Sequence, residues 1–231
     1  MTQTGREIHA SADHAREDGD FLKSLKLIEE ASLIYSSEHD GVGFSELQGS
    51  RFLTLRHLFE KTGDINYLVL AKHSAMAATE LAQKANDPTA LAMPLFNLAK
   101  AQETLGELSD AVNSYKQAIK AQEMTPLSYH NRPAVLNDMK IHLEVCEFKN
   151  GDKKALAKAE DALHDLLEDA LEGSYTKDVW TSGGYMKLAE ALRTDNPTKA
   201  KEYLAKAKKI IDANPELALR KAQWEKLSIT F

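Results

Sequence analysis

Apolar residues recur three and four positions apart along nearly the whole chain. This is the period of an amphipathic α-helix, and it alternates with short polar stretches that would connect one helix to the next. Leucine, alanine, lysine and glutamate are frequent, whereas runs of β-branched residues that favour strands are scarce. The pattern therefore predicts an all-α fold.

The helical pattern is interrupted at regular intervals by a glycine or an asparagine. A glycine inside a helix costs about 1 kcal/mol relative to alanine, so regularly placed glycines indicate turns between helices. Successive marks are 43 to 45 residues apart, and they are Gly19, Gly63, Gly106, Gly151 and Asn196. Spacing this even predicts an internal repeat of helix pairs.

The helix that follows each mark carries small or apolar residues at spacing i, i+4, i+7, which places them on one stripe. Small residues on that stripe would let the two helices of a pair approach closely. The five triplets are Ser24, Ile28, Ala31; Tyr67, Ala71, Ser74; Ala111, Tyr115, Ala118; Ala155, Ala159, Ala162; and Ala200, Leu204, Ala207.

These signals predict five helix pairs and one further helix within a single repeat domain that covers 1–231. The helix that follows the fifth pair should begin at Pro215 with Asn214 as its N-cap, and Trp224 should pack inward from it. We expect the pairs at about 5–38, 43–85, 88–123, 131–171 and 177–212, and the capping helix at 215–229.

The third repeat, LFNLAKAQETLGELSDAVNSYKQAIKA, resembles a tetratricopeptide repeat (TPR). The resemblance rests on Leu98 and Ala99, on the turn at Leu105-Gly106, and on the stripe Ala111, Tyr115, Ala118. With a period of about 44 residues the chain is similar to the long-helix TPR variants. HEAT and armadillo repeats, which have periods in the same range, are the structural alternative.

The resemblance implies a right-handed superhelical solenoid whose first helices line a concave surface and bind peptides or partner proteins. Residues ten positions before the marks are mostly apolar, and those six and three positions before are mostly polar. The apolar set would form either the floor of a groove or core between the helices, and both interpretations stay open. The candidate partner-binding residues are Leu53, His57, Phe96, Lys100, Glu103, Met186, Glu190 and Arg193.

Composition narrows the function further. The net charge of −6 and a pI of about 5.8 disfavour general nucleic-acid binding. No apolar run is long enough to span a membrane, and the lone Cys146, among apolar neighbours, is expected in the core. No phosphate-binding loop, nucleophile elbow or HExxH motif occurs, and His9 and His14, five residues apart, do not share a helical face. We therefore expect a cytoplasmic protein that is not an enzyme and uses no cofactor or metal.

The sequence predicts a non-catalytic adaptor or scaffold that binds a protein or peptide in its concave groove. One alternative is a regulatory protein that senses a peptide or ligand and acts on a separate effector. A second is a scaffold that assembles from copies of itself. The chain is expected to be a monomer or a homodimer. A carboxylate clamp is doubtful, because Lys100 lacks the asparagine that follows one turn later in TPR domains of that kind.

Overall fold

The computed structural model describes residues 4–85, 88–126, 132–169 and 173–231, and these contain eleven α-helices, one short 3₁₀-helix and no strand. The all-α fold of helix pairs with a further C-terminal helix is thereby confirmed. The elements are α1 (Gly5–Glu17), α2 (Phe21–Glu38), α3 (Gly41–Thr62), α4 (Ile65–Lys84), η1 (Pro88–Ala90), α5 (Ala92–Thr104), α6 (Leu108–Met124), α7 (Pro133–Lys149), α8 (Ala155–Glu168), α9 (Ser174–Leu192), α10 (Pro197–Ala213) and α11 (Ala218–Ser228).

The predicted glycine turns are present. All four glycines have φ between 74° and 111°, a left-handed conformation that residues with a side chain rarely adopt. Behind three of the turns an aspartate or asparagine side chain caps the next helix: Asp20 accepts from the Lys23 amide, Asp64 from Asn66 and Asn196 from Lys199. The sequence thus specifies both the end of one helix and the start of the next.

Two asparagines behave differently from the sequence interpretation. Asn196 has φ of −150° and acts as the N-cap of α10, so it is not an equivalent of the left-handed glycines. Asn214 does not cap the last helix, which begins three residues later than predicted, at Ala218. Its side chain instead accepts from the Glu216 amide and donates to Asp178, which holds a tight turn between α10 and α11.

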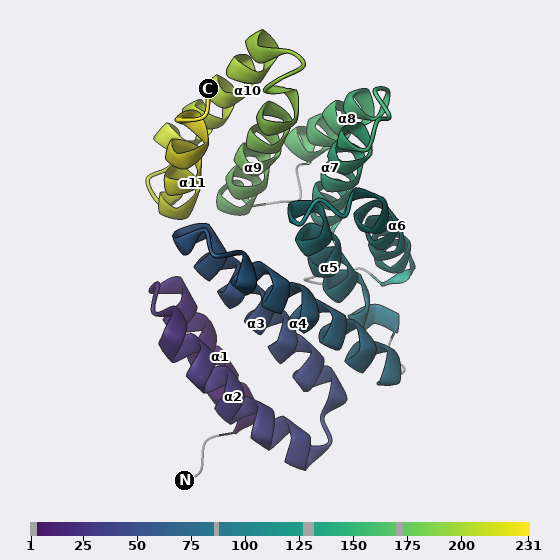
Figure 1. Cartoon of the computed structure of the whole chain (residues 1–231), viewed down its shortest axis with the longest axis vertical. Coiled ribbons are helices and arrows are strands. Elements are labelled where there is room, and N and C mark those ends of the chain that lie inside the picture. Colours follow the sequence, from purple (N-terminus) through teal and green to yellow (C-terminus); the bar gives the residue numbers. More distant parts are fainter. Residues whose placement is uncertain (1–3, 86–87, 127–131, 170–172) are drawn as a thin grey trace. The chain divides into compact units, whose positions relative to one another are not determined.

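Inter-residue contacts group the chain into two compact units, Met1–Thr125 and Pro126–Phe231. In the first unit α1–α2, α3–α4 and α5–α6 form antiparallel pairs, and α2 and α4 each also pack against the first helix of the following pair. In the second unit α7–α8 and α9–α10 form pairs, and α11 lies against α9 and α10 (Figure 1).

The stripe predicted on the second helix of each pair is buried, with only Tyr67 half-exposed. In the second unit the stripe residues other than Ala207 belong to one cluster that also includes Ile141, Val145 and Leu188. Trp224 packs against the same cluster and donates its indole N–H to the Leu204 carbonyl at 3.0 Å. Cys146 is fully buried, as expected of a small core residue.

Candidate partner-binding surface

The first helix of each pair carries the predicted site, so we call α1, α3, α5, α7 and α9 the inner helices. In the first unit α3 contacts both α1 and α5, and in the second α7 contacts α9. Residues at equivalent repeat positions therefore lie on neighbouring helices within each unit. We describe the surface of each unit separately.

On α1 a chain of polar contacts runs along one face and crosses to α3. Arg16 Nη1 lies 2.5 Å from Asp13 Oδ1, and Asp13 Oδ2 lies 3.8 Å from His9 Nε2. The same His9 nitrogen is hydrogen-bonded to Ser50 Oγ on α3 at 2.8 Å, while Nδ1 lies 3.4 Å from the Tyr35 hydroxyl. Burial lowers the pKa of His9, although Asp13 and Glu46 act in the opposite direction.

The contact between His9 and Ser50 resembles part of a hydrolase triad but lacks its geometry. A triad needs the carboxylate on the imidazole nitrogen opposite the one that faces the serine. Here Asp13 approaches the nitrogen that already contacts Ser50, and the other nitrogen faces Tyr35. The arrangement therefore orders side chains between α1, α2 and α3 and does not activate a nucleophile.

The last two turns of α3 hold a second polar group. Glu60 Oε1 accepts from Arg56 Nε at 2.8 Å, and Glu60 Oε2 lies 3.4 Å from His57 Nδ1. Burial alone would raise the pKa of Glu60, but the hydrogen bond from His57 and the charge of Arg56 lower it to about 2. The His57 ring stacks on Phe21 of α2, with ring centroids 5.8 Å apart. His57 is thus held in place, with about 20% of its side chain exposed.

On α5 the predicted residues divide between core and surface. The Phe96 ring is 2% exposed and packs against Tyr115 of α6, with centroids 5.7 Å apart. Lys100 lies half-buried with its Nζ 4.0 Å from the centroid of that ring. Glu103 is buried and accepts a hydrogen bond from the Tyr115 hydroxyl at 2.8 Å. Of these three predicted site residues, Lys100 is the one with substantial exposed surface.

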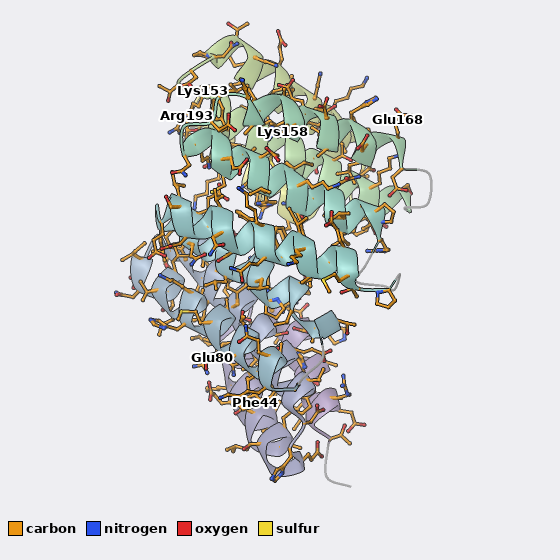
Figure 2. The ribbon with its side chains drawn as sticks, turned by 90° about the vertical axis from the view of Figure 1, so that its right-hand side faces the viewer. Phe44, Glu80, Lys153, Lys158, Glu168 and Arg193 are labelled. Carbon is orange, nitrogen blue, oxygen red and sulfur yellow. The ribbon has the colours of Figure 1, made fainter. Side chains whose placement is uncertain are left out.

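In the second unit the predicted residues lie near the end of α9. Met186 is buried, whereas Glu190 is exposed and its Oε2 lies 4.0 Å from Lys149 Nζ of α7. Arg193 is exposed and follows the last turn of α9; Figure 2 labels it at the same end of this unit as Lys153. Lys153 forms an ion pair with Asp195. The turn edges of neighbouring repeats are therefore joined by charged contacts.

The structure thus separates the eight predicted residues by exposure. Glu190 and Arg193 are exposed, Leu53, His57 and Lys100 are half-buried, and Phe96, Glu103 and Met186 are buried. The apolar position is therefore core at Phe96 and Met186, and Ile141 at the same position is fully buried. Asp13 and Arg56 were not among the predicted residues. The spacing of opposite charges along the helix could have identified them. Asp13 lies four residues after His9 and three before Arg16, and Arg56 lies four residues before Glu60.

The described residues carry no sign of a metal centre or of a membrane span. No cluster of three or more histidine, cysteine, aspartate or glutamate side chains suited to a metal ion occurs among them. None of the helices within the described ranges combines the length and the apolar character needed to cross a bilayer.

The paired helices, left-handed glycine turns and buried small-residue stripe define a TPR-like helical-repeat architecture. Solved structures agree with that class. BtubC (BKLC) from P. vanneervenii is similar, with 20% sequence identity, a TM-score of 0.63, and coverage of 90% of this chain and 80% of that one. The TPR-like repeats of a Podosopora anserina protein described as a kinesin light chain give 18% identity, a TM-score of 0.60, and coverage of 91% and 97%. No protein-family model and no curated protein matches the sequence.

Proposed function

We propose that this protein is a non-catalytic interaction module that binds a protein or peptide along its inner helices. A TPR-like repeat fold suggests a protein-interaction or scaffold module, and that likeness is the observation that carries the proposal. The polar groups of α1 and α3 add to it. Ion pairs and hydrogen bonds fix their positions, so a partner would meet donors and acceptors that are already ordered.

The burial of the apolar positions sharpens the expected chemistry of the partner. Phe96, Ile141 and Met186 are enclosed by the protein itself and offer little area to a ligand. Accessible charged groups on the inner helices include Asp13, Glu60 and Glu190. We therefore propose a partner segment with polar and charged side chains, which such groups recognise by hydrogen bonds and ion pairs.

Site-specific photo-crosslinking tests this proposal. A photoreactive amino acid would replace Glu190 or Asp13 on the inner helices, whose side chains are 53% and 40% exposed. The matched controls carry it at Lys158 or Lys201, exposed positions on α8 and α10, the second helices of their pairs; Figure 2 labels Lys158 on α8. Irradiation in a lysate of the source organism should give the same adduct from both inner positions.

Adducts from the outer positions alone, or none from the inner positions, would overturn the proposal. A substitution such as Phe96→Glu is not a suitable probe. It would bury a carboxylate in the core between α5 and α6, and unfolding would then imitate loss of binding.

A further inference from the structure

The second helices of the pairs, which we call the outer helices, carry a line of four positions at i, i+4, i+7 and i+11 outside the buried stripe, except that the first position of the fourth repeat, Lys153, precedes α8. Its composition changes along the chain. In the first two repeats both ends of the line are apolar, and in the last three they are polar. The five sets are Leu22, Lys26, Glu29, Leu33; Ile65, Val69, Lys72, Met76; Ser109, Asn113, Lys116, Lys120; Lys153, Ala157, Glu160, His164; and Thr198, Glu202, Ala205, Lys209.

The apolar ends of the first two lines are unusually exposed. Leu22 and Leu33 on α2 are 66% and 74% exposed, and Ile65 and Met76 on α4 are 51% and 39% exposed. Isolated exposed apolar residues are common on protein surfaces and by themselves mean little. Here two outer helices of one unit repeat the same arrangement 43 residues apart. Both helices also pack against α3, and on α2 the Glu29 carboxylate reaches Arg51 of that helix while Leu22, Lys26 and Leu33 remain exposed.

The line on α2 is complementary to itself when it is read backwards. Two α2 helices placed antiparallel about a two-fold axis between residues 27 and 28 would bring Leu22 onto Leu33 of the second copy. The same axis would bring Lys26 onto Glu29 of the second copy. The interface would therefore contain two contacts between leucines and two ion pairs between lysine and glutamate.

The line on α4 fits the same operation. An axis between residues 70 and 71 would place Ile65 on Met76 of the second copy, and between these ends it would place Val69 on Lys72 of the second copy. Lys72 is half-buried and its ammonium is already paired with Glu107, so on α4 the contact rests on the apolar ends. These two axis positions are 43 residues apart, which is the offset between equivalent residues of the first two repeats. One two-fold axis across the helices can therefore serve both lines.

We propose that the outer face of α2 and α4 binds a second copy of this chain, with the two copies related by that two-fold axis. The charge pattern favours a second copy over an unrelated partner, because the middle of the α2 line carries one lysine and one glutamate that pair only in reversed order. Glu29 is already oriented by Arg51, whose Nη1 lies 2.6 Å from its Oε1. The contact uses no residue of the inner helices, so it goes beyond the proposed function and leaves that surface accessible.

Sedimentation velocity over about a hundredfold range of concentration tests the proposal, since mass action makes a dimer dependent on concentration. The unmodified protein should shift from monomer to dimer as its concentration rises. Lys26→Glu or Glu29→Lys should each weaken the dimer at least about tenfold, because like charges then face each other across the axis.

Mixing the two variants supplies the decisive comparison. In the mixed pair the glutamate at position 26 of one copy meets the lysine at position 29 of the other, and the remaining Glu29 meets Lys26, so dimer formation should return. The variant Leu22→Ser/Leu33→Ser should also weaken it at least about tenfold through the loss of exposed apolar contacts. Both leucines are highly exposed, so the fold should be preserved, and circular dichroism verifies this.

Lys209→Glu is the matched control, since Lys209 occupies the position of Leu33 on α10 and the change alters the charge by the same amount as Lys26→Glu. It should leave the dimer unchanged. A monomer at every concentration overturns the proposal, and so does a dimer that the α2 variants do not affect or that mixing does not restore.

Discussion

The inner helices α1 and α7 hold the same place in their repeats but use it in opposite ways. The positions ten, six and three residues before the turn glycine are His9, Asp13 and Arg16 in α1, and Ile141, Val145 and Phe148 in α7. The three α7 residues are buried, whereas the α1 residues form a polar chain in which the Asp13 side chain is 40% exposed. One register thus serves either a partly buried polar network or an apolar core.

The difference follows from what each helix packs against. The three α7 residues join a single cluster with the stripe of α8 and with Leu188 of α9. The core face of α1 is formed instead by Ile8 and Ala12, which pack with Ile28 and Ala31 of α2. Its polar line can therefore remain at the boundary with solvent. Under the proposed function, the ordered polar groups of α1 would be available to a partner, whereas the equivalent residues of α7 contribute to the core.

The largest effect that tests this contrast is the loss of a buried side chain in α7. Ile141→Ala should lower the free energy of unfolding by about 3 kcal/mol, because a fully buried isoleucine leaves a cavity. The equivalent change in α1, His9→Ala, should cost about 1 kcal/mol, the typical value of a hydrogen bond. Urea denaturation measures both. Equal losses would contradict the division between core and surface.

Helix glycines provide a second test of how tightly the two units are packed. A Cβ at Gly184 of α9 would lie 2.9 Å from Leu163 Cδ1 and 3.4 Å from Ile141 Cδ1, both within the core. Gly184→Ala should therefore destabilise the protein by about 1–2 kcal/mol, since overpacking outweighs the gain in helix propensity. Gly49→Ala on α3 meets no atom within 4 Å and should stabilise it by up to about 1 kcal/mol.

Thermal unfolding followed by circular dichroism gives the sign of each change. If both glycine variants were more stable than the unmodified protein, the Leu163 side chain would be able to move aside for a Cβ at position 184, and the core around α9 would not be tightly packed. If both variants were less stable, helix propensity would not determine the effect of Gly49→Ala on α3.

Glu60 tests the polar side of the comparison, because Phe148 takes its place in α7. The pKa of Glu60 is lowered from 4.5 to about 2, so its charged form stabilises the folded state. This contribution is complete above pH 4.5 and is lost as the pH falls toward 2. With about 30% of the side chain exposed, Glu60→Gln should cost only about 1 kcal/mol at neutral pH.

Denaturation at neutral pH and at pH below 3 separates this effect from simple packing loss. The cost of Glu60→Gln should shrink in acid, where the wild-type carboxyl begins to take up a proton. A cost that does not change with pH would show that the contacts with Arg56 and His57 do not depend on the charge of Glu60.

Sequence periodicity was enough to predict the fold, but it did not predict which residues of the inner helices are exposed. Glycine turns and small-residue stripes are local signals, and the structure reproduces both. Burial at the inner positions depends on neighbouring helices, so Phe96 and Met186, predicted to bind a partner, lie in the core. The start of α11 was misplaced because the Asn214 side chain bonds to Asp178, a partner 36 residues away that no local pattern reveals.

The smallest expected effect concerns the pH dependence of the α1 network. Burial lowers the pKa of His9 below 6.5, with Arg16 and Arg6 acting in the same sense and Asp13 and Glu46 opposing them. The neutral ring is therefore favoured in the folded state. Its contribution is present above pH 6.5 and is lost as the pH falls through the lowered value. His9→Gln, which can still hydrogen-bond Ser50, should flatten the loss of stability by less than about 1 kcal/mol over this range. Denaturation curves at a series of pH values measure that slope. An unchanged slope would mean that the Asp13 carboxylate compensates for the burial of a protonated His9. The folded state would then not favour the neutral ring.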